Sequence, residues 1–347
     1  MKATHLKLAV ICFVMAVFPL LLMAQPVGKT NVTDSLGRKQ GYWKKYSKDT
    51  LKYEGQFKDD IPVGEFKYYF FNGKVKAQTT YSDNGKVAKT IMYHPGGAKN
   101  GEGTYVDKKK DGTWVYYGIN GMKISEENYV KGVKTGVWKY YYEDGRINRI
   151  ENYKNDHKNG EWMEFYQDSV LKTKGTYVND KLNGVVQCYG LTGKVFLTGK
   201  YVDDLKQGEW MFFNDLGAGE RKLTYKDSYL MKEEVIVPTK GGNKYINAKS
   251  IAWCEAIGKE THIKLITGED ITATVAIDTV DRLLGQINYF RVNSTFEVAI
   301  WAIKNRKTFN KDNPVLTLNP DPGKLVSVDA SVMEGFMSWA DLIKYDK

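Results

Sequence analysis

The stretch GVWKYYYEDGRI, residues 136–147, contains the pattern that decides the fold. Aromatic and β-branched residues flank Asp144-Gly145, which is typical of two strands joined by a tight turn, because glycine accepts a positive φ at low cost. The stretch therefore predicts a β-hairpin. A single hairpin is marginally stable in water, so we expect neighbouring hairpins that share an aromatic surface.

The same pattern recurs with a period of 24 residues. A first aromatic column marks the period: Phe57, Tyr81, Tyr105, Tyr129, Tyr153, Tyr177, Tyr201 and Tyr225. Nine positions after its members stands a second column, which contains Phe66, Trp114, Trp138, Trp162 and Trp210. Thr90 and Val186 depart from that second column. A fixed period of this length is the signature of a repeat architecture. With the earlier segment GYWKKY, residues 41–46, the period predicts eight hairpin units within residues 31–231.

The aromatic columns are interpreted first as core. We expect tryptophan to stack on tryptophan across neighbouring units and to supply most of the buried surface. The alternative is that exposed rings stack on sugar faces. The lysines of VDKKKDG, residues 106–112, and KGVKTG, residues 131–136, are interpreted as solvated turn residues that also discourage edge-to-edge pairing. A basic ridge attracted to an anionic membrane surface is the alternative for these lysines.

The 24-residue period stops after Tyr225, and a different pattern follows. Short apolar runs favour strands at residues 235–237, 251–254, 262–267, 290–300 and 315–318. VAIDTVDRLLGQI, residues 275–287, and SVMEGFMSWADLI, residues 331–343, favour short helices. The sequence therefore predicts a mostly β protein: an elongated hairpin array and then a small, mostly β domain with short helices over residues 235–342.

The first 24 residues have the features of a signal peptide. Lys2 and Lys7 precede an uncharged run from Leu8 to Ala24, and this order is typical of export signals. Cleavage after Ala24 is the favoured interpretation, and an uncleaved membrane anchor is the alternative. In both cases the basic start directs the rest of the chain out of the cytoplasm. We therefore expect a periplasmic or cell-envelope location.

The basic excess of the chain lies in its first two thirds. The whole chain has a net charge of +10, whereas residues 240–347 contain 14 Lys and Arg against 13 Asp and Glu, or +1. A nucleic-acid-binding domain usually concentrates basic residues on its own surface. Charge alone therefore argues against nucleic-acid binding by the C-terminal domain.

The repeat units resemble MORN repeats, in the variant found in YwqK-type proteins. The segment NVTDSLGRKQGYW, residues 31–43, is similar to the usual start of such arrays, and the resemblance covers residues 31–231. It implies an elongated scaffold for contact with a protein or a membrane surface.

The C-terminal part resembles a LytTR domain, the DNA-binding module of bacterial response regulators. The similar stretches are INYFRVNSTFEV, residues 287–298, and VLTLNPDPGKLVSVDAS, residues 315–331. The family usually has histidine, arginine and serine after its phenylalanine-arginine-valine run, where this chain has Asn293, Ser294 and Thr295. The family also has serine and arginine where Asp329 and Ala330 stand. Arginine makes the bidentate contacts to guanine and phosphate, so we expect a degenerate domain without DNA binding.

No motif predicts catalysis. The four histidines, at positions 5, 94, 157 and 262, lack metal-ligand spacing, and no phosphate-binding glycine loop or nucleophile elbow is present. We therefore expect a non-enzymatic protein without catalytic residues, cofactor, metal or small-molecule substrate. The sequence favours an exported scaffold with an envelope protein as its partner. The alternatives are a membrane-anchored LytTR-type transcription regulator and a carbohydrate- or peptidoglycan-binding module.

Overall fold

A computed structural model describes residues 29–285, 287–305 and 314–342. The predicted signal peptide, residues 1–24, and its cleavage site lie outside the described residues. Among the described residues, no helix has both the length and the hydrophobicity needed to cross a bilayer.

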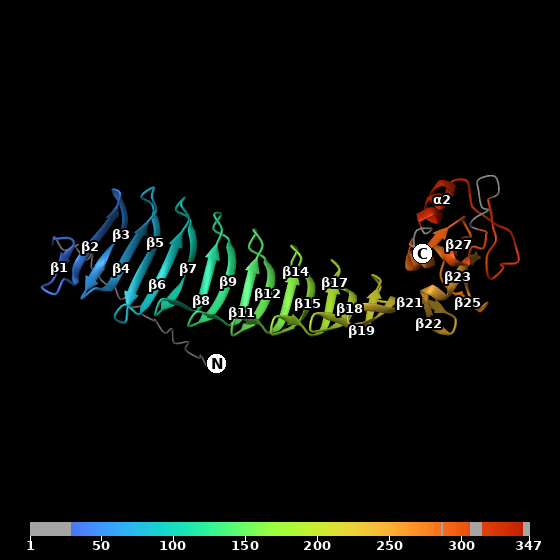
Figure 1. Cartoon of the computed structure of the whole chain (residues 1–347), viewed down its shortest axis with the longest axis horizontal. Helices are drawn as coiled ribbons and strands as arrows, with labels where there is room; N and C mark the ends of the chain where they lie inside the picture. The colour runs from blue at the N-terminus through green and yellow to red at the C-terminus, as the bar shows by residue number, and fades with distance from the viewer. Residues whose placement is uncertain (1–28, 286, 306–313, 343–347) are drawn as a thin grey trace, which may run out of the picture.

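Eight hairpins lie side by side in one antiparallel sheet and make the elongated part of the molecule (Figure 1). Each strand pairs with its neighbours in chain order, so the predicted array of eight hairpin units is confirmed. The hairpins are β2(Lys39–Ser47) with β3(Thr50–Lys58), β4(Ile61–Tyr69) with β5(Val75–Ser82), β6(Val87–Tyr93) with β7(Lys99–Val106), β8(Lys109–Tyr117) with β9(Lys123–Val130), β10(Val133–Lys134) and β11(Gly136–Tyr141) with β12(Ile147–Lys154), β13(His157–Lys158) and β14(Gly160–Phe165) with β15(Leu171–Val178), β16(Lys181–Leu182) and β17(Gly184–Tyr189) with β18(Val195–Val202), and β19(Leu205–Phe213) with β20(Gly219–Lys226).

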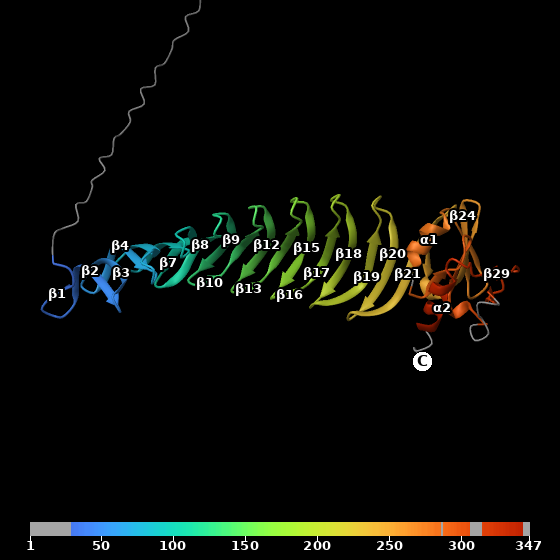
Figure 2. The ribbon, with the colours of Figure 1, turned by 90° about the horizontal axis from the view of Figure 1, so that it is seen from above.

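The strands change direction gradually along the array, as a comparison of Figures 1 and 2 shows. This is the twist expected of neighbouring β-strands. The outer edge of β2, the first strand of the array, is covered in part by β1(Val32–Thr33), which pairs with Lys39 and Gln40. Asp34 anchors this end through an ion pair with Arg38 at 2.8 Å. Burial opposes its ionisation, but hydrogen bonds from Arg38 and Gln40 outweigh that effect and lower the pKa of Asp34 to about 2.

Two kinds of turn alternate along the array. The turn inside a unit places glycine at positive φ, as at Gly145 (φ 85°), whose N–H donates to the Tyr142 carbonyl at 2.9 Å. The turn between units has two residues at positive φ, such as Asn155 (52°) and Asp156 (69°), which is the conformation of a type I′ turn. Asparagine and aspartate tolerate this conformation better than other side-chain-bearing residues.

The turn between units also ties each unit to the one before it. Asp156 Oδ1 accepts from the Lys134 N–H at 2.8 Å, and the Asp156 N–H donates to the Lys134 carbonyl at 3.1 Å. Asp180 makes the same pair of bonds with Lys158 at 2.7 and 2.9 Å. The periodic acidic residues of these turns are therefore structural.

Tryptophan rings insert between tyrosine rings of the two neighbouring strands. Trp138 lies 5.2 Å from Tyr129 and 4.8 Å from Tyr153, measured between ring centroids. The expected stacking of tryptophan on tryptophan is wrong, because in an antiparallel array a tyrosine-bearing strand separates each two tryptophan-bearing strands. Among the described residues, the ring partners of the array tryptophans are tyrosines or a phenylalanine.

Glycines make room for several of these rings. A Cβ atom built on Gly103 would lie 2.2 Å from Trp114, and one on Gly199 would lie 2.0 Å from Trp210. Gly55 makes the same room for Phe66, at 2.4 Å. Each of these glycines stands two positions before a member of the first aromatic column and so shares its period, a signal that the sequence alone contains.

The array continues into the C-terminal domain through one strand. β21(Tyr229–Thr239) pairs with β20 and with β22(Gly242–Asn247), and its residues Val235 and Val237 are buried in the core of the domain. The boundary predicted between residues 231 and 235 thus falls within a single strand. Arg282 of α1(Ile277–Leu284) also donates to both carboxylate oxygens of Glu220 in β20, at 2.6 and 2.8 Å.

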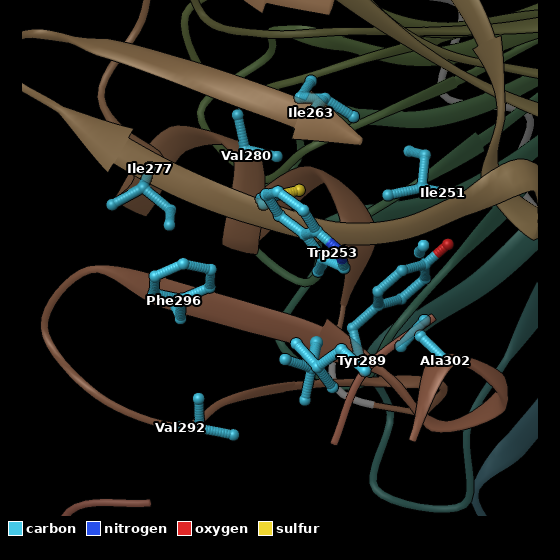
Figure 3. Packing of buried hydrophobic residues seen from close by; sticks show 14 of the residues in the cluster. Ile251, Trp253, Ile263, Ile277, Val280, Tyr289, Val292, Phe296 and Ala302 are labelled. Atoms are coloured by element: carbon cyan, nitrogen blue, oxygen red, sulfur yellow. The ribbon is translucent and has the colours of Figure 1, made fainter. Parts of the chain in front are cut away.

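The C-terminal domain packs a five-stranded sheet against its helices around one core (Figure 3). The sheet order is β25(Asp270–Ala273), β24(Glu260–Leu265), β23(Ile251–Ile257), β27(Phe296–Ala299) and β26(Tyr289–Arg291). Two 3₁₀ turns, η1(Ala248–Ser250) and η2(Ile300–Ala302), the pair β28(Val315–Leu316) and β29(Val326–Ser327), and α2(Met333–Leu342) complete it. Trp253, Ile263, Val280 and Phe296 are among the buried residues that Figure 3 labels.

The single strand expected over residues 290–300 is two strands, β26 and β27, joined by a tight turn. Asn293 causes the break, since its Oδ1 accepts from the N–H groups of Thr295 at 2.9 Å and Phe296 at 2.8 Å. The two predicted helices are confirmed as α1 and α2, so the mostly β fold with short helices is also confirmed.

We predict that Gly103→Ala lowers the free energy of unfolding by about 1–3 kcal/mol, because the new methyl group collides with Trp114. Urea denaturation measures the change. Gly96→Ala is the matched control, since nothing lies within 4 Å of its Cβ position and its φ is outside the left-handed region. Equal stability of the two variants would contradict this account of the glycine column.

Candidate functional site

The array has two faces of different character. The aromatic face is the side of the sheet that carries the inserted rings Phe66, Trp114, Trp138, Trp162 and Trp210 together with the tyrosine column. The opposite face carries a further tyrosine series. There the Tyr117 hydroxyl donates to Glu102 of the preceding strand at 2.8 Å, and burial together with this bond raises the pKa of Tyr117. Val137 and Val185 on this face are 41% and 58% exposed.

Lysines cover the rings of the aromatic face. The Lys110 ammonium lies 5.1 Å from the Trp114 ring centroid, Lys134 lies 4.7 Å from Trp138, and Lys206 lies 4.8 Å from Trp210. The interpretation of Lys110 and Lys134 as solvated turn residues is therefore wrong. Their aliphatic stems lie along apolar surface while the charge interacts with the ring face. Lys108, Lys109 and Lys131 are exposed, as expected.

A buried carboxylate interrupts the rings in the middle of the aromatic face. Glu151 is only 3% exposed, and it accepts from Tyr153 at 2.9 Å and from Lys158 at 2.8 Å. Arg149 lies 3.2 Å from the same carboxylate. These partners satisfy the charge, so the group is a structural ion cluster rather than a candidate acid or base.

The third unit opens a cleft of about 770 Å³ on the aromatic face. Its floor contains Ala77, Thr79, Ala88 and Thr90, and the Thr79 and Thr90 hydroxyls are hydrogen-bonded at 3.0 Å. Its walls are aromatic and apolar: Tyr68, Phe70, Tyr81, Met92, Tyr93 and Tyr105. Apart from Phe70, which follows β4, these residues belong to strands β4 to β7, drawn blue to cyan in Figure 1. We call this hollow the third-unit cleft.

The cleft exists because this unit departs from the repeat. Thr90 occupies the place of tryptophan, and Met92 occupies the place where Tyr68, Tyr116 and Tyr140 stand in other units. The flanking tyrosines therefore have an inserted ring on one side only: Tyr81 lies 5.1 Å from Phe66, and Tyr105 lies 4.6 Å from Trp114. Thr90 stands out in the sequence as a departure from the second column, but the hollow that it leaves is visible only in the structure.

The rim of the third-unit cleft is basic. Lys76, Lys86 and Lys108 line it and are exposed, and none of them forms an ion pair within the described part of the chain. The single acidic lining residue, Asp60, already accepts a hydrogen bond from the Lys39 N–H at 2.9 Å. His94 also lines the cleft, with its Nε2 3.0 Å from the Tyr117 carbonyl.

Arg291 and Asn293, in the first stretch that resembles a LytTR domain, are hydrogen-bonded within the C-terminal domain. Arg291 donates from Nε to the Asn293 carbonyl at 2.8 Å and lies 3.5 Å from Asp278. Asn293 Nδ2 donates to the Ser327 carbonyl at 2.9 Å, which joins the two predicted contact segments. The Asp329 side chain is exposed beside them. Arg291 is therefore already held by groups of the domain itself.

The described residues contain no group of three or more His, Cys, Asp or Glu side chains that could hold a metal ion. Cys188 is half-buried and Cys254 is buried, and both are free thiols. One further ionisable group is unusual. Glu297 on β27 is fully buried, and burial, with a smaller contribution from the carboxylate of Asp281, raises the pKa of Glu297 to about 9.

The comparisons with known proteins agree with the repeat architecture. The family model of the MORN repeat variant matches residues 62–83, 134–155 and 158–179. These three segments of the array are therefore similar to the MORN repeat variant, and such repeats suggest a protein that binds other proteins or membranes. No curated protein matches the sequence.

Several solved structures are similar to parts of the chain. The C-terminal match is the LytTr DNA-binding domain of a methyl-accepting/DNA response regulator from Bacillus cereus, with 19% identity, 30% of this chain and 94% of that chain covered, and a TM-score of 0.26. S. aureus TarM shares 11% identity over 35% of this chain and 19% of that chain, with a TM-score of 0.18. The Photorhabdus luminescens Tc holotoxin pore shares 11% identity over 65% of this chain and 16% of that chain, with a TM-score of 0.19.

We predict that Glu297→Gln removes a pH dependence from the stability of the C-terminal domain. The folded pKa of about 9 lies above the ordinary value of 4.5, so the folded state keeps a proton that the unfolded chain releases. Stability of the natural chain should therefore fall as pH rises from about 4.5 towards 9, by on the order of a few kcal/mol. Hydrogen exchange in β23 and β27 measures this at pH 5 and pH 8. A natural chain with equal stability at both values would contradict the assignment.

Proposed function

We propose that the protein is an exported, non-enzymatic scaffold of the bacterial cell envelope whose repeat array binds another envelope protein. The observation that carries this proposal is the single-layered array, in which no helix or second sheet of the described residues covers either long face (Figures 1 and 2). An extended sheet of this kind offers a large recognition surface without an enclosed site. The matches to the MORN repeat variant support the same class of function.

Export rests on the N-terminal sequence and agrees with the charge distribution. The basic start and apolar run precede the array, and the C-terminal domain has little net charge. The sequence has no arginine at the LytTR contact positions 293–295 and 329–331, which also suits a domain that does not meet DNA. In this proposal the C-terminal domain is a second protein-binding module, held to the array by β21 and by the Glu220–Arg282 pair.

A C-terminal alkaline phosphatase fusion tests the location. We expect an active fusion, because this enzyme requires the oxidising periplasm for its disulfides. The control is the same fusion without residues 2–24, which should be inactive. An inactive full-length fusion would contradict export and favour the transcription-regulator alternative, as would retardation of a DNA fragment at physiological salt.

Site-specific photo-crosslinking in living cells tests the scaffold role. A crosslinker at Val137 or Val185 lies on the exposed opposite face of the array, and one at Leu325 lies on an exposed loop of the C-terminal domain. We expect discrete protein adducts from at least one array position. Adducts formed with lipid alone would contradict a protein partner and would favour membrane-surface binding through the basic turns.

A further inference from the structure

The third-unit cleft has the geometry of a vacant ring position. In regular units, one ring lies between two rings of the first column: Phe66 lies 5.1 Å from both Phe57 and Tyr81, and Trp210 lies 5.1 Å from Tyr201 and 6.1 Å from Tyr225. At Thr90 the two bounding tyrosines, Tyr81 and Tyr105, remain, and the ring between them is replaced by a short hydroxyl side chain. The surrounding unit is otherwise folded in register.

The cation that covers a ring in other units also remains. Lys86 precedes Lys110 and Lys134 by one and two periods of 24 residues, and both of those lysines cover the tryptophan of their own unit. Lys86 has no such ring in its unit, because Thr90 stands there. A ring inserted into the cleft would therefore contact two tyrosine rings and one ammonium group. These are the contacts that tryptophan makes elsewhere in the array.

We infer that the third-unit cleft binds an aromatic side chain, tryptophan in the best case, that a partner protein presents within an acidic segment. This inference rests on the proposed role of the array as a protein-binding surface and names the chemistry of the partner. A cleft of about 770 Å³ accommodates an indole with its neighbouring residues. Lys76, Lys86 and Lys108 at the rim complement acidic residues on both sides of the ring, since none is neutralised within the array.

A sugar ring would also stack on tyrosine, but the charges favour a peptide. The rim supplies three ammonium groups, and its one carboxylate is held by a backbone N–H. Recognition of a neutral sugar relies on several polar side chains that accept and donate around the ring. The floor here is formed by Ala77, Ala88 and a pair of threonine hydroxyls that are bonded to each other, and among the other polar lining residues Asn100 is bonded to His94. The contacts thus match an apolar ring bordered by anions.

Binding of labelled nine-residue peptides to the purified chain, followed by fluorescence polarisation, tests the inference. The peptides combine a central Trp, Leu or Ala with flanks of Glu and Asp or of Lys. We expect saturable binding of the acidic Trp peptide, and about tenfold or weaker binding when the centre is Ala or the flanks are Lys. No saturable binding, or equal binding of the Ala-centred peptide, would overturn the inference.

Thr90→Trp supplies the missing ring from the chain itself and should lower peptide affinity by about tenfold or more. The matched control is Thr80→Trp, the same substitution at an exposed position on the opposite face of the neighbouring strand β5, which should bind as the natural chain does. Equal affinity of the two variants would overturn the inference. Thermal unfolding checks that Thr90→Trp is folded.

A second variant keeps the test valid if Thr90→Trp fails to fold. Lys86→Gln with Lys108→Gln alters only exposed side chains and should lower affinity for the acidic Trp peptide severalfold, with a weaker dependence on salt. Unchanged affinity would overturn the role of the rim. A trimer of N-acetylglucosamine that binds in the cleft when no peptide does would replace the peptide assignment by a carbohydrate one.

The failure of this inference is distinguishable from failure of the proposed function. If peptides do not bind but array crosslinks to an envelope protein persist in Thr90→Trp, the scaffold role stands and the cleft assignment falls. If the fusion locates the chain in the cytosol, the envelope role falls whatever the peptides show.

Discussion

The array depends on one constraint: an aromatic ring is inserted between two others. The inserted ring lies above a strand position that has little or no side chain. The sheet is a single layer, so its core consists of the rings that lie flat on its aromatic face. Trp114, with no exposed surface, is buried by the rings of Tyr105 and Tyr116, by the backbone of Gly103 and by the stem of Lys110. A shift of one residue in strand register would move every ring to the other face. The 24-residue period therefore fixes the register of neighbouring hairpins as well as their number.

The same ring insertion explains the third unit, in which Thr90 replaces the inserted ring. Repeat arrays bury their core through contacts between neighbours, and a unit without its ring is sustained by the units on each side. At Thr90 the neighbours Phe66 and Trp114 hold Tyr81 and Tyr105 in place. The result is a preformed hollow, and a preformed site lowers the cost of ordering when a partner binds. The proposed binding site is thus the one position of these three neighbouring units where Thr90 stands in place of the inserted aromatic ring.

Much of the fold could be predicted from the sequence, because the turns and aromatic columns are local signals repeated eight times. Gly145 and the Asn155-Asp156 turn show why: each residue type matches the backbone conformation that it adopts. The placement of rings could not be predicted in the same way. Whether Trp138 meets another tryptophan or a tyrosine depends on the order of strands in the sheet, and the role of Lys110 depends on which face its stem reaches. The break at Asn293 could not be predicted, because β-propensity is high on both sides of it and its side-chain hydrogen bonds are visible only in the structure. Thr90 marks the place of the cleft in the sequence, but the walls and rim come from strands β4 to β7 and from the turns that hold Lys86 and Lys108.

The most direct measurement of the central claim is a crystal structure of the Thr90→Trp variant. If ring insertion governs this array, the introduced indole lies on the aromatic face between Tyr81 and Tyr105, with ring centroids about 5–6 Å apart, and Lys86 covers it. An indole turned out to solvent, with the hollow still open beneath it, would contradict the account.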